Sequence, residues 1–298
     1  MRSFIIGTRK SALALAQTRL VEQAVRAAFP SLAIEICEIS TIGDQRLDLS
    51  LTAAAGQLDK GLFTKELEEA LLDGRIDAAV HSLKDLPTIL PEGLALAAVL
   101  PRANVEDWLV SKTTGGFAAL PEGAIVATSS LRRHLQIRSV RPDLRIVEIR
   151  GNVATRLRKL AENSDWSATV LAAAGLERLG LVENGEISFE LQHYHVSNLT
   201  PDVTLPAVGQ GAIGIEVRSD FSKHADVLKA INHAPTWESV SLERSLLRAL
   251  GGGCQMPLGV RSFFVDERWN LEAVLHRDGV EIRANGCDVE ALAAELLA

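Results

Sequence analysis

A strand–helix–strand pattern occurs twice in this chain of 298 residues and constrains its fold more than any other feature. Residues 5–17, IIGTRKSALALAQ, align with residues 125–137, IVATSSLRRHLQI, and the strand-like run 30–39 aligns with 142–149. In each copy a segment with helical periodicity lies between two apolar runs. The repeat predicts two related α/β domains on mostly parallel sheets, the helix of the second copy being about two turns shorter.

Hydroxyl and arginine side chains occupy the same place in both copies, the junction between the first strand and its helix. They are Thr8, Arg9 and Ser11 in the first copy, and Thr128, Ser129, Ser130, Arg132 and Arg133 in the second. In parallel sheets ligands bind beyond the carboxyl ends of the strands, where helix N-termini favour anions. These residues are therefore candidate binding residues for an acidic ligand.

The charge is unevenly distributed along the chain. A net charge of −7 argues against a general nucleic-acid-binding protein. Residues 132–159 nevertheless hold nine positive side chains against two negative ones, and no aromatic residue on which a base would stack. Four of the arginines are expected on solvated faces: Arg138, Arg141, Arg145 and Arg158. Arg150 and Arg156 lie at predicted strand–helix junctions, so the segment predicts a local anion site.

Composition excludes several other classes. The chain is 47% hydrophobic and 23% charged, which is typical of globular proteins. No apolar run approaches the roughly 20 residues of a membrane helix, and the first residues do not resemble a secretory signal. Cys37, Cys254 and Cys287 are unevenly spaced, so we expect neither a disulfide framework nor a metal site. A soluble cytoplasmic protein is the expected result.

Residues 243–259, ERSLLRALGGGCQMPLG, combine a helical pattern with a glycine-rich stop. Leucines fall on one face of this helix, and Glu243, Arg244 and Arg248 on the other. Three glycines precede Cys254, although one glycine is enough to cap a helix. Backbone without side chains lets a bulky group approach the thiol, whereas a buried structural cysteine is the common alternative.

Two further segments carry polar or glycine-rich patterns. HSLKDLP at 81–87 follows a short apolar strand, 77–80. An isolated aspartate such as Asp85 is most often a turn or capping residue, but its place beyond a strand end weakens that interpretation. GQGAIG at 209–214 matches a dinucleotide fingerprint, yet strand-like residues follow it, so we interpret it as a hinge where the chain returns to the first domain.

Together these segments resemble the signatures of porphobilinogen deaminases (hydroxymethylbilane synthases). The resemblance rests on TRxSxLAxxQ at 8–17, KGLFTKELE at 60–68, HSLKDLP, TSSLRR at 128–133, RGNVxTRL at 150–157, LPAVGQGA at 205–212 and the cysteine segment. It implies a transferase that joins four porphobilinogen molecules head to tail, releases ammonia each time and frees the linear tetrapyrrole hydroxymethylbilane. Such an enzyme acts in tetrapyrrole biosynthesis, which leads to haem, chlorophyll and corrins.

The resemblance also implies the domain organisation. Two periplasmic-binding-protein-like α/β domains would comprise residues 1–101 with 212–230, and residues 105–206. A small C-terminal α+β domain, residues 234–298, would carry the cofactor; its apolar runs 259–265, 269–276 and 280–286 predict an antiparallel sheet, with a final helix over 289–297. The enzyme is expected to be a monomer.

Individual residues receive roles from the resemblance. Cys254 would carry a dipyrromethane cofactor through a thioether, and Asp85 would be the catalytic carboxylate. The remaining cofactor-binding residues would be Asp44, Lys84, Thr128, Ser129, Ser130, Arg132, Arg133, Arg156 and Gly253. Porphobilinogen would be bound by Arg9, Ser11, Lys60, Phe63, Arg150, Asn152, Arg156, Arg178 and Gln210.

These residue types suit the reaction. Porphobilinogen bears acetate and propionate groups, and guanidinium groups bind carboxylates through hydrogen bonds of about 1.5–3 kcal/mol each. Loss of ammonia leaves a cationic azafulvene, and attack on it gives a protonated pyrrole. A carboxylate beside the pyrrole nitrogens stabilises both cations and transfers protons, which is the role expected of Asp85.

One segment departs from the family pattern, and two other functions compete with it. Residues 44–63 keep Lys60 and Phe63 but have Asp59 in place of a glycine and lack an upstream lysine, so we expect altered loop contacts rather than altered chemistry. A non-catalytic anion-binding protein of the periplasmic-receptor type would give Cys254 no role. A cysteine hydrolase would need a histidine, and none lies near Cys254 in sequence. A covalent pyrrole adduct distinguishes the three.

Overall fold

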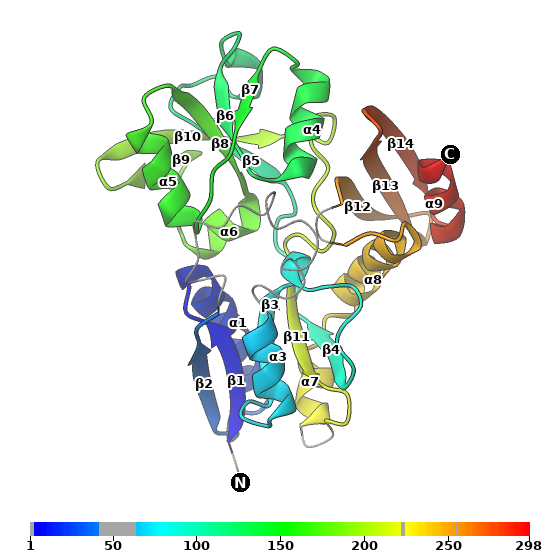
Figure 1. The fold of residues 1–298 in the computed structure, drawn as a ribbon. Coiled ribbons are helices and arrows are strands. Elements are labelled where there is room, and N and C mark those ends of the chain that lie inside the picture. The colour runs from blue at the N-terminus through cyan, green and yellow to red at the C-terminus, as the bar shows by residue number, and fades with distance from the viewer. Residues whose placement is uncertain (1–2, 42–63, 222–223, 254–255) are drawn as a thin grey trace. The chain divides into compact units, whose positions relative to one another are not determined.

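The computed structural model describes residues 3–41, 64–221, 224–253 and 256–298 and divides into two compact units (Figure 1). Unit 1 comprises Met1–Arg102 and Ala212–Val240, and unit 2 comprises Ala103–Gly211 and Ser241–Ala298. Four residues with roles predicted from the sequence lie outside the described residues: Asp44, Lys60, Phe63 and Cys254.

Unit 1 is built on a five-stranded sheet of order β2-β1-β3-β11-β4. Its strands are β1 (Phe4–Arg9), β2 (Ile34–Ile39), β3 (Ala78–Ser82), β4 (Leu94–Val99) and β11 (Ile213–Arg218). The first three are parallel, whereas β11 runs antiparallel to both β3 and β4. The glycine-rich run before β11 therefore leads into a strand, as predicted, and not into the helix of a dinucleotide-binding site.

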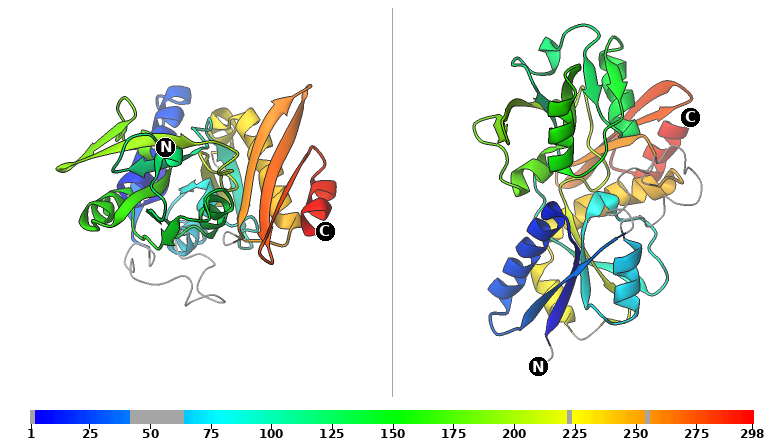
Figure 2. Two further views of the ribbon diagram at one scale, coloured as in Figure 1. Left: turned by 90° about the horizontal axis from the view of Figure 1, so that it is seen from above. Right: turned by 60° about the vertical axis from the view of Figure 1, so that its left-hand side comes forward.

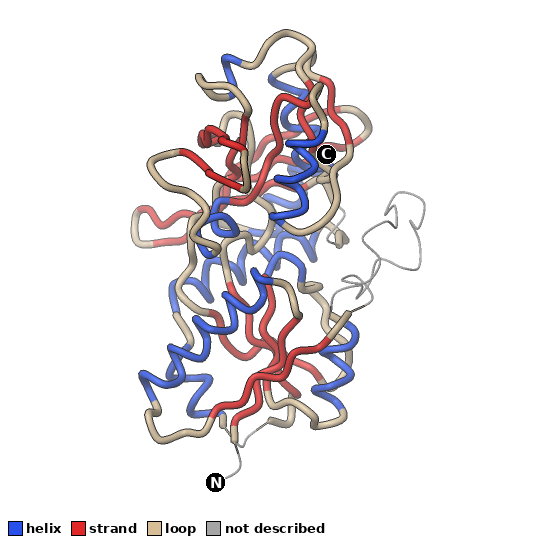
Figure 3. The backbone as a smooth tube through the Cα atoms, turned by 90° about the vertical axis from the view of Figure 1, so that its left-hand side faces the viewer, coloured by secondary structure: helices blue, strands red, loops and turns tan. Residues whose placement is uncertain are grey.

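Helices cover both faces of this sheet, as Figure 3 shows. They are α1 (Ala12–Ala28), α3 (Lys65–Leu72), α7 (Ala225–Ile231) and the start of α8 (Ala234–Ala249). Phe4 and Ile6 of β1 share a core with residues of α1 and α7, whereas Ile5 packs with residues of α3. Alternate side chains of β1 are thus buried on opposite faces, which is why its sequence is an uninterrupted apolar run.

Unit 2 contains a six-stranded sheet of order β7-β6-β8-β5-β10-β9. Its strands are β5 (Asp107–Ser111), β6 (Ile125–Ala127), β7 (Arg145–Val147), β8 (Trp166–Ala172), β9 (Glu186–Phe189) and β10 (Gln192–Leu199). β6, β7 and β8 are parallel, and β5 is antiparallel to β8 and β10. Its helices are α4 (Leu131–Val140), α5 (Val153–Glu162) and α6 (Ala173–Arg178).

The internal repeat predicted from the sequence is confirmed. β1, α1 and β2 in unit 1 correspond to β6, α4 and β7 in unit 2, and each strand pair is parallel. α1 has 17 residues and α4 has 10, a difference of about two helical turns. In both sheets an antiparallel strand, β11 or β5, follows the third parallel strand.

The C-terminal residues form a smaller layer within unit 2 (Figure 2). Antiparallel strands β12 (Leu258–Val265), β13 (Arg268–Arg277) and β14 (Val280–Gly286) are followed by α9 (Val289–Leu297). Both hairpin turns contain consecutive residues with positive φ, Asp266–Glu267 and Asp278–Gly279, as tight hairpins require. The predicted fold class, two α/β sheets with a small antiparallel C-terminal layer, is therefore confirmed. Among the described helices, none is long and apolar enough to cross a membrane.

Candidate functional site

Unit 1 brings four predicted site residues, Arg9, Ser11, Lys84 and Asp85, to one edge of its sheet. β1 ends at Arg9 and β3 ends at Ser82, and parallel strands have their carboxyl ends at the same edge. Ser11 is the N-cap of α1, and its oxygen accepts a hydrogen bond from the Ala14 N–H at 3.3 Å. Asp85 follows β3 directly, in the 3₁₀ turn Leu83–Asp85.

The turn holds Asp85 in place through its apolar neighbours. Leu83 and Leu86 are 1% and 2% exposed and belong to one buried cluster, whereas Asp85 between them is exposed. The Leu83 N–H donates to the Ala212 carbonyl oxygen at 3.0 Å, and the Leu86 N–H to that of Leu83 at 3.1 Å. The two leucines that flank Lys84 and Asp85 in HSLKDLP thus anchor the backbone and leave the Asp85 carboxylate accessible.

Gln17 of α1 forms hydrogen bonds with Ser82, at the start of the segment that carries Asp85. The sequence patterns did not single out Gln17 as a functional residue. Its Nε2 donates to Ser82 Oγ at 2.9 Å, and Ser82 Oγ lies 3.2 Å from Gln17 Oε1. Gln17 is 3% exposed, on the helix face that also buries Ala14, Thr18 and Val21. A glutamine on an otherwise small and apolar face was the signal, because a buried amide needs partners.

Unit 2 places hydroxyl and amide groups at the carboxyl ends of its parallel strands. Ser130 is the N-cap of α4, and Asn152 is the N-cap of α5, accepting from the Thr155 N–H at 2.9 Å. Ser129 Oγ donates to the Ile149 carbonyl oxygen at 2.8 Å and accepts from its N–H at 3.0 Å, joining the ends of β6 and β7. Two helix N-termini therefore lie at the edge where the sequence predicts an anion site.

Arg132 and Arg133 share one carboxylate, that of Asp107 at the start of β5. Arg132 Nη1 donates to Asp107 Oδ2 at 2.8 Å, while Arg133 donates to Oδ1 from Nη2 at 2.7 Å and from Nε at 3.1 Å. Burial alone would raise the pKa of Asp107, but the two guanidinium charges and their hydrogen bonds outweigh burial and lower it. Asp107 could not be identified from the sequence, because nothing local marks it as the partner of two arginines that lie 25 and 26 positions later in the chain.

Arg150 and Arg178 each have a donor with no acceptor in the described part of the chain. Within the described part of the chain, the Nε atoms of both side chains are buried and have no hydrogen-bond partner. Arg178 Nη2 donates to the Gly211 carbonyl oxygen at 2.6 Å, and burial lowers the pKa of Arg178. Arg156 lies nearby in sequence, and its Nε donates to the Gly151 carbonyl oxygen at 2.8 Å.

Residues 205–211, which we call the crossover segment, accept hydrogen bonds from two of the unit 2 arginines, Arg132 and Arg178. Leu205 receives hydrogen bonds at its carbonyl oxygen from Arg132 Nη1 at 2.5 Å and from the Gln136 side chain, and its N–H donates to Gln136 Oε1 at 2.7 Å. Gln210 is fully buried, and its Nε2 donates to the Val105 carbonyl oxygen at 2.7 Å and to Asp107 Oδ1 at 2.9 Å. The predicted site residues of unit 2 are thus connected through this backbone.

The helix before Cys254 ends as its glycines require, but two of the three charged residues on its polar face are buried. Gly251 has φ +68°, and the N–H groups of Gly251 and Gly252 donate to the carbonyl oxygens of Arg248 and Leu247, a Schellman cap. A Cβ on Gly252 would come within 2.5 Å of Met256 Sδ, whereas one on Gly253 would meet no described atom within 4 Å. A Cβ on Gly251 would likewise meet no described atom within 4 Å, so Gly251 and Gly253 border open space and Gly252 does not.

Glu243 and Arg244 are buried, although they lie on the polar face of this helix. The sequence places them on a polar face, yet they are 0% and 6% exposed. Glu243 Oε2 accepts from the Gly209 N–H at 2.8 Å and Oε1 from Ser262 Oγ at 2.7 Å. The helix is buried on two sides because the crossover segment and β12 both pack against it.

We expect Gly211→Ala to destabilise the protein by at least about 2 kcal/mol more than Gly123→Ala. Both glycines have positive φ, +83° and +73°, so alanine is strained at either position. A Cβ at Gly211 would lie 2.6 Å from the Ala103 carbonyl oxygen, whereas one at Gly123 would meet nothing within 4 Å. Urea unfolding followed by circular dichroism measures both changes, and equal destabilisation would contradict the close contact.

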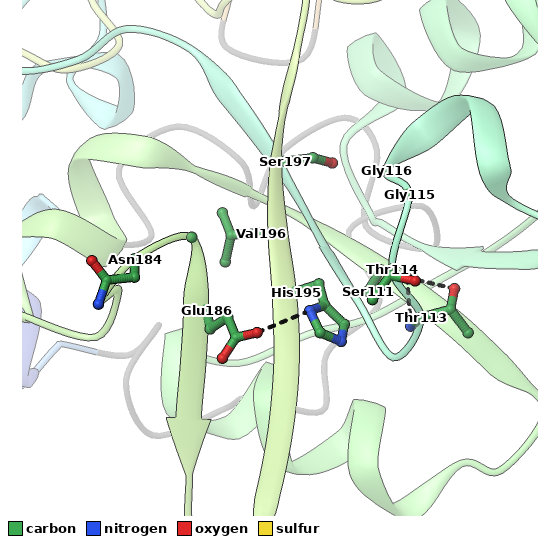
Figure 4. A pocket seen from close by; sticks show the side chains of 11 residues that line it. Ser111, Thr113, Thr114, Gly115, Gly116, Asn184, Glu186, His195, Val196 and Ser197 are labelled. Atoms are coloured by element: carbon green, nitrogen blue, oxygen red, sulfur yellow. Dashed lines mark hydrogen bonds and ion pairs between the residues drawn. The ribbon is translucent and has the colours of Figure 1, made fainter.

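A separate hollow of about 310 Å³ lies at the edge of the unit 2 sheet opposite to the edge that carries the arginines (Figure 4). It is lined by residues near the carboxyl end of β5, including Ser111 and Thr113, and by the β9–β10 hairpin, where His195 Nδ1 is 3.4 Å from Glu186 Oε1. β5 is antiparallel to β8, so its carboxyl end is remote from the edge that carries the arginines. None of the predicted site residues lines this hollow.

Comparison with known proteins identifies the family of the chain. Residues 4–226 match the family model described as porphobilinogen deaminase, dipyromethane cofactor binding domain, and residues 237–296 match its C-terminal domain. A porphobilinogen deaminase of Desulforudis audaxviator is 48% identical over 283 residues, which cover 94% of this chain and 87% of the relative. One of Moorella thermoacetica is 48% identical over 278 residues, covering 93% of this chain and 84% of the relative.

The two family models together span the segments that carry Asp85, the unit 2 arginines and Cys254. The relatives match over most of their own length as well as over most of this chain. The chain therefore belongs to the porphobilinogen deaminase family, transferases (hydroxymethylbilane synthases) of tetrapyrrole biosynthesis that use a dipyrromethane cofactor.

Proposed function

We propose that the arginines at the carboxyl edge of the unit 2 sheet hold the acid groups of dipyrromethane and of porphobilinogen. The observation that carries this proposal is the pair of buried Nε atoms of Arg150 and Arg178, which have no hydrogen-bond partner among the described residues. An unsatisfied buried donor costs about 1–3 kcal/mol, so it is expected where a ligand supplies the acceptor. A carboxylate suits a guanidinium donor in both charge and geometry.

The other groups at this edge also fit the cofactor. Dipyrromethane, when bound, supplies the pyrrole carbon to which the first porphobilinogen is joined. Ser130 accepts a hydrogen bond through its oxygen from the Arg133 N–H, so its own hydroxyl hydrogen remains for a carboxylate. We also assign cofactor contacts to Thr128, Ser129 and Arg156 of unit 2, and substrate contacts to Asn152 and Gln210 of unit 2. From the family resemblance, Lys84 of unit 1 is assigned to the cofactor, and Arg9 and Ser11 of unit 1 to the substrate.

We assign Asp85 the role of stabilising positive charge and moving protons at the pyrrole nitrogens. Its carboxylate is exposed on a turn that two buried leucines and backbone hydrogen bonds hold in place. A positioned carboxylate of this kind contributes by proton transfer and by electrostatic stabilisation of developing charge. Cys254, in the same proposal, is the thioether attachment site, and the open space beside Gly253 accommodates the pyrrole rings.

The domain organisation and environment of the enzyme complete the proposal. We assign residues 1–101 with 212–230, residues 105–206 and residues 234–298 to three domains. The separate buried cluster formed by α8, β12, β13, β14 and α9 supports the third of them. The three unevenly spaced cysteines and the net charge of −7 support a cytoplasmic monomer that acts on a small molecule rather than on nucleic acid.

Arg178→Gln is expected to raise the KM for porphobilinogen about 10- to 100-fold, because one charge-assisted hydrogen bond is lost. Arg158→Gln is the matched control, since Arg158 is half exposed and pairs with Glu190 at 2.7 Å. Steady-state consumption of porphobilinogen gives both constants, and intact mass shows whether each variant still carries the cofactor. An unchanged KM in Arg178→Gln would remove the basis for assigning the substrate acid groups to this residue.

A further inference from the structure

Asp107 is the centre of a buried cluster that includes three residues assigned to the site. It is 1% exposed, and its carboxylate accepts hydrogen bonds from Arg132, Arg133 and Gln210. Arg132 and Arg133 are each 5% exposed, and Gln210 is 0% exposed. Asp107 begins β5, whose pairing with β8 fixes its backbone, so the carboxylate has a defined position.

Among the described residues, the cluster carries one uncompensated positive charge. Two guanidinium groups share a single carboxylate, and a buried charge is unfavourable unless it is paired. One additional carboxylate would neutralise the cluster. A second would leave it with an excess negative charge, so the site suits one acid group and not two.

The two arginines differ in how many donors they have already used. Arg133 donates from Nε and Nη2 to Asp107 and from Nη1 to the Val170 carbonyl oxygen at 2.8 Å, which involves all three of its nitrogens. Arg132 forms both of its hydrogen bonds through Nη1, to Asp107 and to the Leu205 carbonyl oxygen. Among the described residues, Nε and Nη2 of Arg132 have no acceptor, and these two atoms form the edge that binds a carboxylate in bidentate geometry.

We propose that Asp107 is a positioning residue: it fixes Arg133 as a support and orients Arg132 so that its Nε–Nη2 edge binds a single carboxylate of dipyrromethane. The inference rests on the proposed function of this edge of unit 2. It adds which of the neighbouring arginines contacts the acid group and which acts through Asp107. The inference also explains why a negatively charged residue, Asp107, lies inside a site proposed to bind anions.

Four variants test this, each purified as the folded fraction from cells that make porphobilinogen: Arg132→Gln, Asp107→Asn, Asp107→Asn with Arg133→Gln, and Asp143→Asn. Asp143 is the matched control, because it also binds an arginine in bidentate fashion, Arg141, at 2.7–2.8 Å within unit 2. Intact mass gives the fraction of molecules with the cofactor, and thermal unfolding reports stability separately. A merely structural role for Asp107 would lower stability without changing the cofactor content of the molecules that fold.

We expect cofactor content to fall at least about tenfold in Arg132→Gln and in Asp107→Asn, and to remain complete in Asp143→Asn. In the double variant one charge of each sign is removed, so the net charge is restored, and Arg132 Nη1 no longer competes with Arg133 for the one acceptor oxygen left at position 107. Arg132 can therefore keep its orientation, and cofactor content should recover towards the wild-type value. A fully loaded Asp107→Asn would overturn the inference. A double variant with cofactor content as low as that of Arg132→Gln would also overturn it, since that result would mean that Arg133 contacts the ligand directly. Because the double variant restores the charge balance, it decides the question even where Asp107→Asn does not fold. If Arg132→Gln were fully loaded, the cofactor role of Arg132 would fail, and this inference with it.

Discussion

Replacing Asp85 by asparagine is expected to lower kcat by roughly 10³-fold, because an amide neither accepts the proton nor stabilises the cationic intermediates. Within the described residues the Asp85 carboxylate forms no hydrogen bond or ion pair, and it is exposed. Stability should therefore change by no more than about 0.5 kcal/mol, which separates catalysis from folding. The rate of porphobilinogen consumption and the thermal unfolding temperature measure the two effects.

Two further variants make the Asp85 result specific. Asp85→Glu keeps the carboxylate but moves it by one methylene, so we expect a small residual activity above that of the asparagine variant. Asp73→Asn, at another exposed aspartate of unit 1 that pairs with Arg75 at 3.4 Å, should be as active as the wild type. An asparagine variant at position 85 with near wild-type kcat would exclude Asp85 as the catalytic carboxylate.

Cys254→Ser should abolish both activity and the covalent cofactor. Wild-type protein from cells that make porphobilinogen is expected to exceed its sequence mass by two porphobilinogen units less two molecules of ammonia. Serine is a much weaker nucleophile than a thiolate, so the variant should have the unmodified mass. Intact-mass spectrometry of freshly purified protein measures this difference directly.

Cys287→Ser serves as the control for attachment at Cys254, since Cys287 is an exposed free cysteine at the end of the small sheet. It should retain the full added mass and normal turnover. Two results would reject Cys254 as the attachment site: the added mass persisting in Cys254→Ser, or its loss in Cys287→Ser. Wild-type protein without any added mass would support a non-catalytic binding protein.

The elements that could be predicted from the sequence are those whose signals are local. Strand–helix junctions, the glycine cap at Gly251 and the two tight hairpins of the C-terminal layer depend on neighbouring residues and formed as expected. The position of Asp85 beyond β3 followed from the same reasoning. These features need no knowledge of which distant segments meet.

The features that could not be predicted depend on contacts between distant parts of the chain. Asp107 meets arginines 25 and 26 residues later, and Gln17 meets Ser82 across 65 residues. The sequence places Glu243 on the polar face of its helix, but helical periodicity distinguishes polar from apolar residues and not solvated from buried ones. Only the partners, the Gly209 N–H and Ser262 Oγ, explain why a carboxylate is buried there.

The crossover segment has a consequence for the geometry of ligand binding. Arg132 is hydrogen-bonded to its first carbonyl oxygen, at Leu205, and Arg178 to its last, at Gly211. Long arginine side chains would otherwise allow their guanidinium groups to shift independently. Here both are attached to one short piece of backbone, so main-chain geometry sets the spacing between the two guanidinium groups that we propose as carboxylate-binding groups. In the proposed site, a fixed length of polypeptide would therefore determine the separation of the acid groups that the enzyme accepts.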